Sequence, residues 1–253
     1  MTLTNHKDEK NVAGPEMVLA GTIIAGLLNV PAMLAFFFSR NPNPDVWWHL
    51  ATGQWIVEHG TLPATDPFSY TATGTPWAAY SWLFELILLG LVQTCGLAGV
   101  TLFTAIVWTL SSITLFFLIR RYCTHLLLSG ALTLTAICGM EPLGSARPWH
   151  FTILCFLLEL SVLLSARRPD RQRRLLWLLP LFIFWANVHI QFVLGLVVLA
   201  VALLESCIGW LFRDKDFLNE SRANSPVWMS VICVFCAAAT LINPYGWQIY
   251  GTV

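Results

Sequence analysis

The chain has 253 residues, of which 57% are hydrophobic and only 11% are charged. Soluble domains carry roughly 45–50% apolar and about 25% charged residues. This composition, with a mean hydropathy of +0.67, therefore excludes a water-soluble enzyme, a disordered chain and an ordinary secreted module. Fourteen basic residues balance fourteen acidic ones, and a neutral chain predicts no nucleic-acid partner. Twelve tryptophans, which favour the membrane–water interface, complete the pattern of a polytopic protein in a lipid bilayer.

Eight apolar segments approach the length of about 20 residues that a helix needs to cross the hydrocarbon core. The first, 17–38, is too long for the apolar region of a signal peptide and is expected to stay as an anchor. The second, 79–95, is short and contains several polar side chains. The other six, in chain order, are 99–119, 125–140, 149–166, 175–189, 191–212 and 227–242.

The basic residues distinguish two topologies. If 79–95 lies along or dips into the outer surface, about seven helices span, the N-terminus (1–16) is cytoplasmic, and only Arg40 and Arg147 of the fourteen basic residues fall outside. If all eight segments span, the best orientation leaves three basic residues outside. The seven-span topology also brings four polar segments to one face, as a chemical site requires. These segments are 41–80, 141–150, 187–191 and 243–248.

The sequence thus predicts an all-α polytopic membrane protein with a single membrane domain over 1–253. A long first outer loop (39–98), with interfacial or juxtamembrane helices, precedes the remaining transmembrane helices (99–253). This outer loop contains most of the unusual chemistry.

Proline residues mark the start of a short helix in the outer loop. Asn41-Pro-Asn-Pro44 cannot continue a helix, because proline lacks the N–H and restricts the residue before it. An interfacial helix over 46–59 is therefore expected, with Asp45 at its N-cap and Gly60 at its end. His49 lies one turn beyond Asp45 and faces the same way. Two interpretations of Asp45 stay open: a helix cap, or a carboxylate that works with His49 in chemistry.

Other polar residues are expected on the same outer side. Asp66 is placed to bond the backbone ahead of it in a turn. The guanidinium of Arg147 could bind phosphate or extend to lipid headgroups. His150 follows it, Asn187-Val-His189 closes one span, and Asn243-Pro-Tyr245 follows the last one. These side chains could line a cavity, although polar helix ends at an interface would look the same.

Two acids fall inside expected spans, where a carboxylate costs about 2.5–3.5 kcal/mol at the bilayer centre. Glu205 lies about two turns from Arg213, and Glu159 nearly two turns from Arg167. A structural pairing with these arginines would account for both acids. The segment 166–174 has five arginines and is interpreted as a cytoplasmic loop that meets anionic lipid.

Several blocks resemble bacterial membrane proteins related to the GT-C glycosyltransferases, the polyprenyl-phosphate-sugar-dependent enzymes of the mannosyltransferase and arabinosyltransferase type. The resemblance runs along nearly the whole chain and is more specific for the membrane family than for an activity. The blocks are Asn43-Pro-Asp-Val-Trp-Trp-His-Leu-Ala-Thr-Gly53, Glu58-His-Gly60, Asp66-Pro-Phe-Ser-Tyr70, Trp77, Trp82-Leu-x-Glu85, Arg147-Pro-x-x-Phe-Thr152, Ala186-Asn-Val-His189 and Asn243-Pro-Tyr-Gly-Trp247.

The resemblance implies a GT-C-like transferase of the bacterial inner membrane, which moves a sugar from a polyprenyl-phosphate donor to an acceptor on the outer face. Asp45 matches the family's acidic residue, which acts as catalytic base or helps to hold a divalent cation such as Mg²⁺ or Mn²⁺. His49 would support it, and Arg147 would neutralise the departing phosphate. The substrate-binding residues would be Arg147, His150, His189, Asn243 and Tyr245.

Departures from the family pattern support an alternative. Asn43 stands where relatives often have the first acid of Asp-x-Asp, and Tyr80-Ser81 stands where many have His-Glu. The chain ends at Val253, where relatives usually continue through further spans, so a shortened member of the family is expected. The alternative is a non-catalytic membrane scaffold, or a subunit completed by other membrane subunits, that keeps the fold without the activity.

Overall fold

The computed structural model describes residues 16, 19–21, 23, 24, 27, 44–140, 143, 145–211 and 225–252. Within these residues the regular structure is helical, and strand pairing is limited to one isolated bridge between Thr65 and Pro76. Most of the expected first span, 17–38, lies outside the described residues. So do Asn43 and the basic residues Lys7, Lys10, Arg40, Arg213, Lys215 and Arg222.

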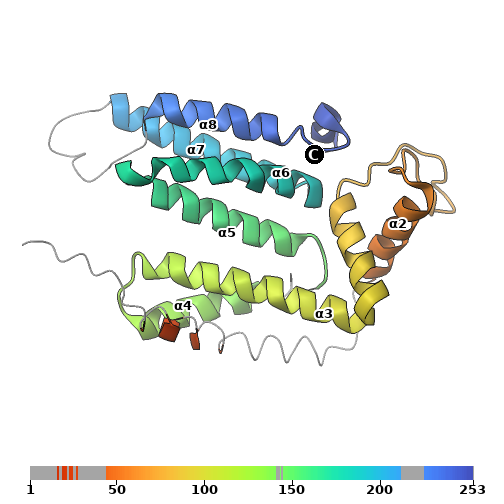
Figure 1. Cartoon of the computed structure of the whole chain (residues 1–253), viewed down its shortest axis with the longest axis horizontal. Helices are drawn as coiled ribbons and strands as arrows, with labels where there is room; N and C mark the ends of the chain where they lie inside the picture. Colours follow the sequence, from red (N-terminus) through yellow and green to blue (C-terminus); the bar gives the residue numbers. More distant parts are fainter. Residues whose placement is uncertain are drawn as a thin grey trace, which may run out of the picture.

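Most helices lie side by side in one bundle (Figure 1). α3 packs against α4 and α5, α5 packs against α6 and α7, and α8 packs against α6 and α7. α2 and the first turns of α3 lie at one end of the bundle (Figure 1). The described helices are α2 (Asp45–His59), α3 (Trp82–Arg120), α4 (Leu126–Gly139), α5 (Trp149–Ala166), the 3-10 helix η2 (Pro169–Trp177), α6 (Leu178–Val188), α7 (Phe192–Leu211), α8 (Pro226–Ala239) and the 3-10 helix η3 (Gly246–Gly251).

A glycine divides α3 into two parts. Gly96 has φ 65° and ψ −166°, a conformation that glycine adopts without the steric cost of a Cβ. The two parts run in different directions, and the first part lies beside α2 (Figure 1). The expected segments 79–95 and 99–119 are therefore continuous in one helix but separated by a break.

Three of the described helices, α3, α5 and α7, are long and apolar enough to cross a membrane. α4 and α8 are apolar but have only 14 residues each, and α6 has 11. A helix of 14 residues is about 21 Å long, which is shorter than the roughly 30 Å of a hydrocarbon core. The structure thus supports a helical membrane protein, and the seven spans and the cytoplasmic N-terminus stay predictions.

The main apolar core lies among α5, α6, α7 and α8. Phe182 and Trp185 of α6 are fully buried there, together with Phe192 of α7. A Cβ on Gly195 would lie 2.6 Å from Trp185 Cζ3 and 2.9 Å from Phe182 Cζ. Glycine therefore permits the close approach of α7 to α6.

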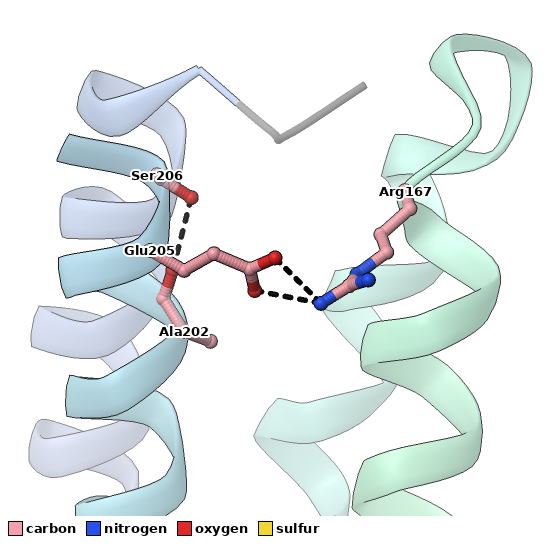
Figure 2. Close-up of polar contacts among 4 residues, drawn as sticks. All are labelled: Arg167, Ala202, Glu205 and Ser206. Carbon is pink, nitrogen blue, oxygen red and sulfur yellow. Dashed lines mark hydrogen bonds and ion pairs between the residues drawn. The ribbon is translucent and has the colours of Figure 1, made fainter. Parts of the chain in front are cut away.

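An ion pair joins α5 and α7 at the other end of the bundle from α2. Arg167 Nη2 donates to both carboxylate oxygens of Glu205, at 2.6 and 2.7 Å, and Ser206 bonds the Ala202 carbonyl beside it (Figure 2). Arg167 thus pairs with Glu205, and the expected pairing of Arg167 with Glu159 is wrong. Glu159 is fully buried, and neither of its oxygens has a hydrogen-bond partner among the described residues.

Candidate functional site

Asp45 and Arg147 are in direct contact. Asp45 is the first residue of α2, and the residue before the helix is Pro44 rather than the expected Asp45. Arg147 lies in the connection between α4 and α5, and its Nη2 is 2.7 Å from Asp45 Oδ2. The side chains are 49% and 39% exposed, so the pair is accessible from outside the protein. The structure therefore joins the two residues that the sequence assigned separately to base and phosphate-binding roles.

His49 and Glu85 form a second, more buried pair beside the first. His49 lies one turn after Asp45 on α2, and its Nδ1 is 3.3 Å from Oε1 of Glu85 in the first turn of α3. The side chains are 14% and 4% exposed. Glu85 Oε2 is also buried and has no hydrogen-bond partner among the described residues.

Glu85 was not predicted as a site residue. Its sequence signal was an acid at the fourth position of an apolar helical segment that begins at Trp82.

A close contact between α2 and α3 fixes this second pair. A Cβ on Gly53 would lie 2.6 Å from the Glu85 carbonyl oxygen and 3.2 Å from Leu89 Cβ. Gly53 lies one turn beyond His49, so the same helix face that approaches α3 also carries His49 to Glu85. The lack of a side chain at Gly53 is therefore a condition for the His49–Glu85 contact.

His189 lies between α6 and α7 and is buried against side chains of α5. Its Nδ1 is 2.7 Å from the Thr152 hydroxyl of α5, and its ring packs edge-on against Trp149. Burial, with a smaller effect from the charge of His49, lowers the pKa of His189 to about 4, because both disfavour the imidazolium. His189 is therefore neutral near pH 7.

The hydrogen bonds around His189 favour one arrangement of its ring protons. The Trp185 indole N–H donates to the Thr152 oxygen at 3.1 Å, and the Thr152 hydroxyl in turn lies next to His189 Nδ1. This geometry suits donation from the hydroxyl to Nδ1, which leaves the imidazole proton on Nε2. His189 can then act as a neutral hydrogen-bond donor.

The other predicted substrate-binding residues mainly support local structure. His150 Nδ1 is 3.2 Å from the Arg147 carbonyl, and the His150 ring packs edge-on against Trp108 of α3. Asn243 donates to the carbonyls of Thr240 and Gly246, and its Oδ1 accepts from the Tyr245 N–H at 2.8 Å.

Tyr245 itself is partly buried near the start of α3. Burial raises the pKa of its phenol, which lies close to the Ala79 backbone. The structure thus brings Asn243 and Tyr245 to the same end of the bundle as Asp45.

Asn187 joins three elements and borders a cavity. Its Oδ1 accepts from the Trp82 indole N–H at 3.0 Å, and its Nδ2 donates to the carbonyls of Ile183 and Ile242. This cavity is shallow and open to the surface, with a volume of about 660 Å³. Its lining is mostly apolar and consists of Trp82, Leu83, Pro180, Ile183, Phe184, Asn187, Ile242, Asn243 and Pro244.

The loop after α2 folds back on that helix. Asp66 Oδ1 accepts from the N–H groups of Phe68 and Ser69 at 2.8 and 3.0 Å, which confirms the expected turn. Hydrogen bonds from the Ser69 side chain and from these N–H groups lower the pKa of Asp66. Phe68 and Trp77 pack edge-on against Trp48 of α2 with ring centroids 5.1 and 5.6 Å away. The loop thereby covers the helix that carries Asp45.

The described residues offer no group of three or more His, Cys, Asp or Glu side chains that could hold a metal ion. Asp45, the expected ligand of a divalent cation, instead has a guanidinium as its counter-charge. These side chains do not form a fitting ligand set for such an ion.

No protein-family model, curated protein or solved structure matches the chain. The function is therefore inferred from the arrangement of the site residues. The structure brings together Asp45, Arg147, His49 and Glu85, and it places His189 close enough to His49 for the charge of His49 to disfavour protonation of His189.

Proposed function

We propose that the chain is a GT-C-like membrane glycosyltransferase that transfers a sugar from a polyprenyl-phosphate donor to an acceptor hydroxyl on the outer face of the bacterial inner membrane. The observation that carries this proposal is the 2.7 Å contact between Asp45 and Arg147. Transfer from a phosphate donor needs a base for the acceptor and a cation for the leaving group. This contact supplies both groups at one accessible position.

In the proposed reaction the acceptor oxygen attacks C1 of the sugar, and the bond between C1 and the phosphate oxygen breaks. The proton of the acceptor hydroxyl passes to the Asp45 carboxylate. The polyprenyl phosphate leaves with one more negative charge, which the Arg147 guanidinium neutralises. The incoming donor phosphate competes with Asp45 for Arg147, so donor binding frees the carboxylate for its role as base.

The neighbouring groups support this reaction. His49 is held through Nδ1 by Glu85, which fixes its ring and leaves Nε2 for the substrate. A neutral His189 adds a hydrogen-bond donor without a second positive charge. The apolar cavity between Trp82 and Ile242 suits the hydrocarbon chain of a lipid-linked donor.

One observation favours the alternative, a membrane scaffold or subunit without catalytic activity. Asp45 and Arg147 neutralise each other. A purely structural role, in which the ion pair connects α2 to the α4–α5 connection, also accounts for this contact. A scaffold would keep this contact for its contribution to folding, and the protein would co-purify with other membrane subunits.

Donor turnover by the purified full-length protein tests the proposal. The protein is incubated with a mixed pool of polyprenyl-phosphate sugars beside the variant Asp45→Asn, and free polyprenyl phosphate is measured. We expect turnover by the wild-type chain and its loss in the variant. Turnover by neither, from well-folded samples, would favour the scaffold.

A further inference from the structure

A row of arginines lies at the end of the bundle that is opposite to Asp45. η2 is a 3-10 helix with three residues per turn, so residues three apart lie above one another on one face. Arg168 directly precedes this helix, and Arg171 and Arg174 follow at intervals of three. These three side chains, the arginine row, are spaced about 6 Å apart along the helix axis. Arg173 leaves η2 on a different face.

A fourth guanidinium, Arg121, lies close to the arginine row. It follows the last residue of α3, and its two terminal nitrogens donate to the Ser161 carbonyl and hydroxyl and to the Ser165 hydroxyl of α5, at 2.9–3.1 Å. Burial, followed by the charges of Arg174, Arg168 and Arg171, lowers the pKa of Arg121. Ser165, which Arg121 binds, lies three residues before Arg168, and η2 packs against α5. Arg121 is therefore held by α5 next to the arginine row, and four positive charges converge there.

The acidic side chains described nearby do not balance this cluster. Asp170 lies 3.6 Å from Arg171, but its side chain is 72% exposed. Glu205 is bound by Arg167 (Figure 2). The convergence of like charges is unfavourable by itself, and an anion with several oxygens relieves it.

Exposed aromatic side chains indicate the depth of the cluster in the membrane. Tyr122 directly follows Arg121, and Trp177 ends η2; they are 73% and 70% exposed. Tyrosine and tryptophan gather at the membrane–water interface. Leu127, near the start of α4, and Leu176, which precedes Trp177, are also exposed and provide apolar surface for acyl chains. The cluster thus has the surroundings expected at the level of the lipid headgroups.

We propose that Arg121 and the arginine row form a binding site for the phosphate of an anionic phospholipid. The guanidinium group donates two parallel hydrogen bonds to phosphate oxygens, which lysine cannot do. Arg121, whose terminal nitrogens already donate to Ser161 and Ser165, provides a positive charge that is fixed in place, and the arginine row provides the donors along the headgroup. The site uses no residue of the proposed transfer reaction.

Lipid binding by the full-length protein tests this site. The protein is purified in a non-ionic detergent, freed of lipid and titrated with short-chain phosphatidylglycerol, and the bound lipid is counted by native mass spectrometry. We expect Arg171→Gln and Arg174→Gln each to weaken binding about five-fold, the effect of one arginine near an anionic headgroup. Arg173→Gln removes the same charge from another face of η2 and is expected to leave the affinity within about two-fold.

Three results would overturn the proposal. Equal losses in Arg171→Gln and Arg173→Gln would show a diffuse attraction with no defined site. Equal binding of phosphatidylcholine would show that the site does not select anionic lipids. Displacement of the lipid by an equal concentration of inorganic phosphate would assign the site to a free anion. Sugar transfer is measured on the same samples, and its presence or absence leaves the lipid result unchanged.

Discussion

The two ends of the helix bundle differ in how their charged side chains are arranged. At the end with α2, opposite charges pair across elements, as Asp45 does with Arg147 and His49 with Glu85. At the other end, Arg121 converges with the three arginines of the row, and Glu205 is held by Arg167. The net charge of the whole chain is zero, but the charges are paired at one end and predominantly positive in the cluster at the other. Paired groups beside a buried neutral histidine suit a reaction, whereas unbalanced guanidiniums suit an anionic surface.

The largest difference between the two ends is expected from their half-exposed ion pairs. Asp45→Asn removes the proposed base and is expected to lower sugar transfer by about 10³-fold, because a general base contributes roughly 10²–10⁴. Glu205→Gln breaks a pair of similar exposure at the other end and is expected to leave transfer nearly unchanged. Both are expected to change the free energy of unfolding by less than about 1 kcal/mol. Similar turnover in the two variants would contradict the role of Asp45.

The buried histidine predicts a pH dependence of stability at the α2 end. The pKa of His189 is lowered to about 4 in the folded protein, so the unfolded chain binds a proton more readily. The stabilisation is complete above about pH 6.5, the ordinary histidine value, and is lost as the pH falls towards 4, by roughly 3 kcal/mol in total. Unfolding is measured in detergent between these values. His189→Asn is expected to flatten the curve, and an unchanged slope in this variant would refute the assignment.

The contact that holds His49 against Glu85 can be broken without touching either residue. Gly53→Ala places a Cβ 2.6 Å from the backbone carbonyl of Glu85 and is expected to cost about 1–3 kcal/mol of stability. Gly90→Ala, in α3 with open space around it, is expected to stabilise the protein by about 0.5–1 kcal/mol. Thermal unfolding of the two variants measures the difference, and equal effects would argue against the close contact of α2 with α3.

A comparison of two buried acids separates paired from unpaired carboxyl groups. Glu159→Leu removes a carboxyl without a hydrogen-bond partner among the described residues and is expected to stabilise the bundle by about 1 kcal/mol. Glu85→Leu removes the partner of His49 and is expected to destabilise it by about 1–2 kcal/mol. Loss of stability in both variants would indicate that Glu159 has a partner in the rest of the chain.

Local features of the fold were predictable from the sequence. The helix ending at His59, with Gly60 in a left-handed conformation, follows the expected pattern, and α5 has the expected bounds of 149–166. The Asp66 turn is also as predicted. Each of these features depends on neighbours within a few positions, such as proline before a helix, glycine after it, or a side chain that bonds the next N–H groups.

Contacts between distant segments were not predictable in the same way. The sequence identified Asp45 and Arg147 as candidates, but their contact depends on how α2 packs against the helices that follow it. Spacing along the chain suggested Arg167 as the partner of Glu159. In the structure α7 packs beside α5, and Arg167 therefore forms its ion pair with Glu205. Side-chain pairing in a helix bundle follows the helix neighbours, which one sequence without relatives does not specify.

A charge exchange between Asp45 and Arg147 tests the central claim most directly. Asp45→Arg combined with Arg147→Asp restores an ion pair between the same two positions but moves the carboxylate and the guanidinium to the wrong elements. Thermal stability and donor turnover are measured together for the two single variants, the double variant and the wild-type protein. We expect the double variant to recover the wild-type stability and to have no turnover. Recovery of turnover together with stability would contradict the account, because the pair would then be only a structural brace.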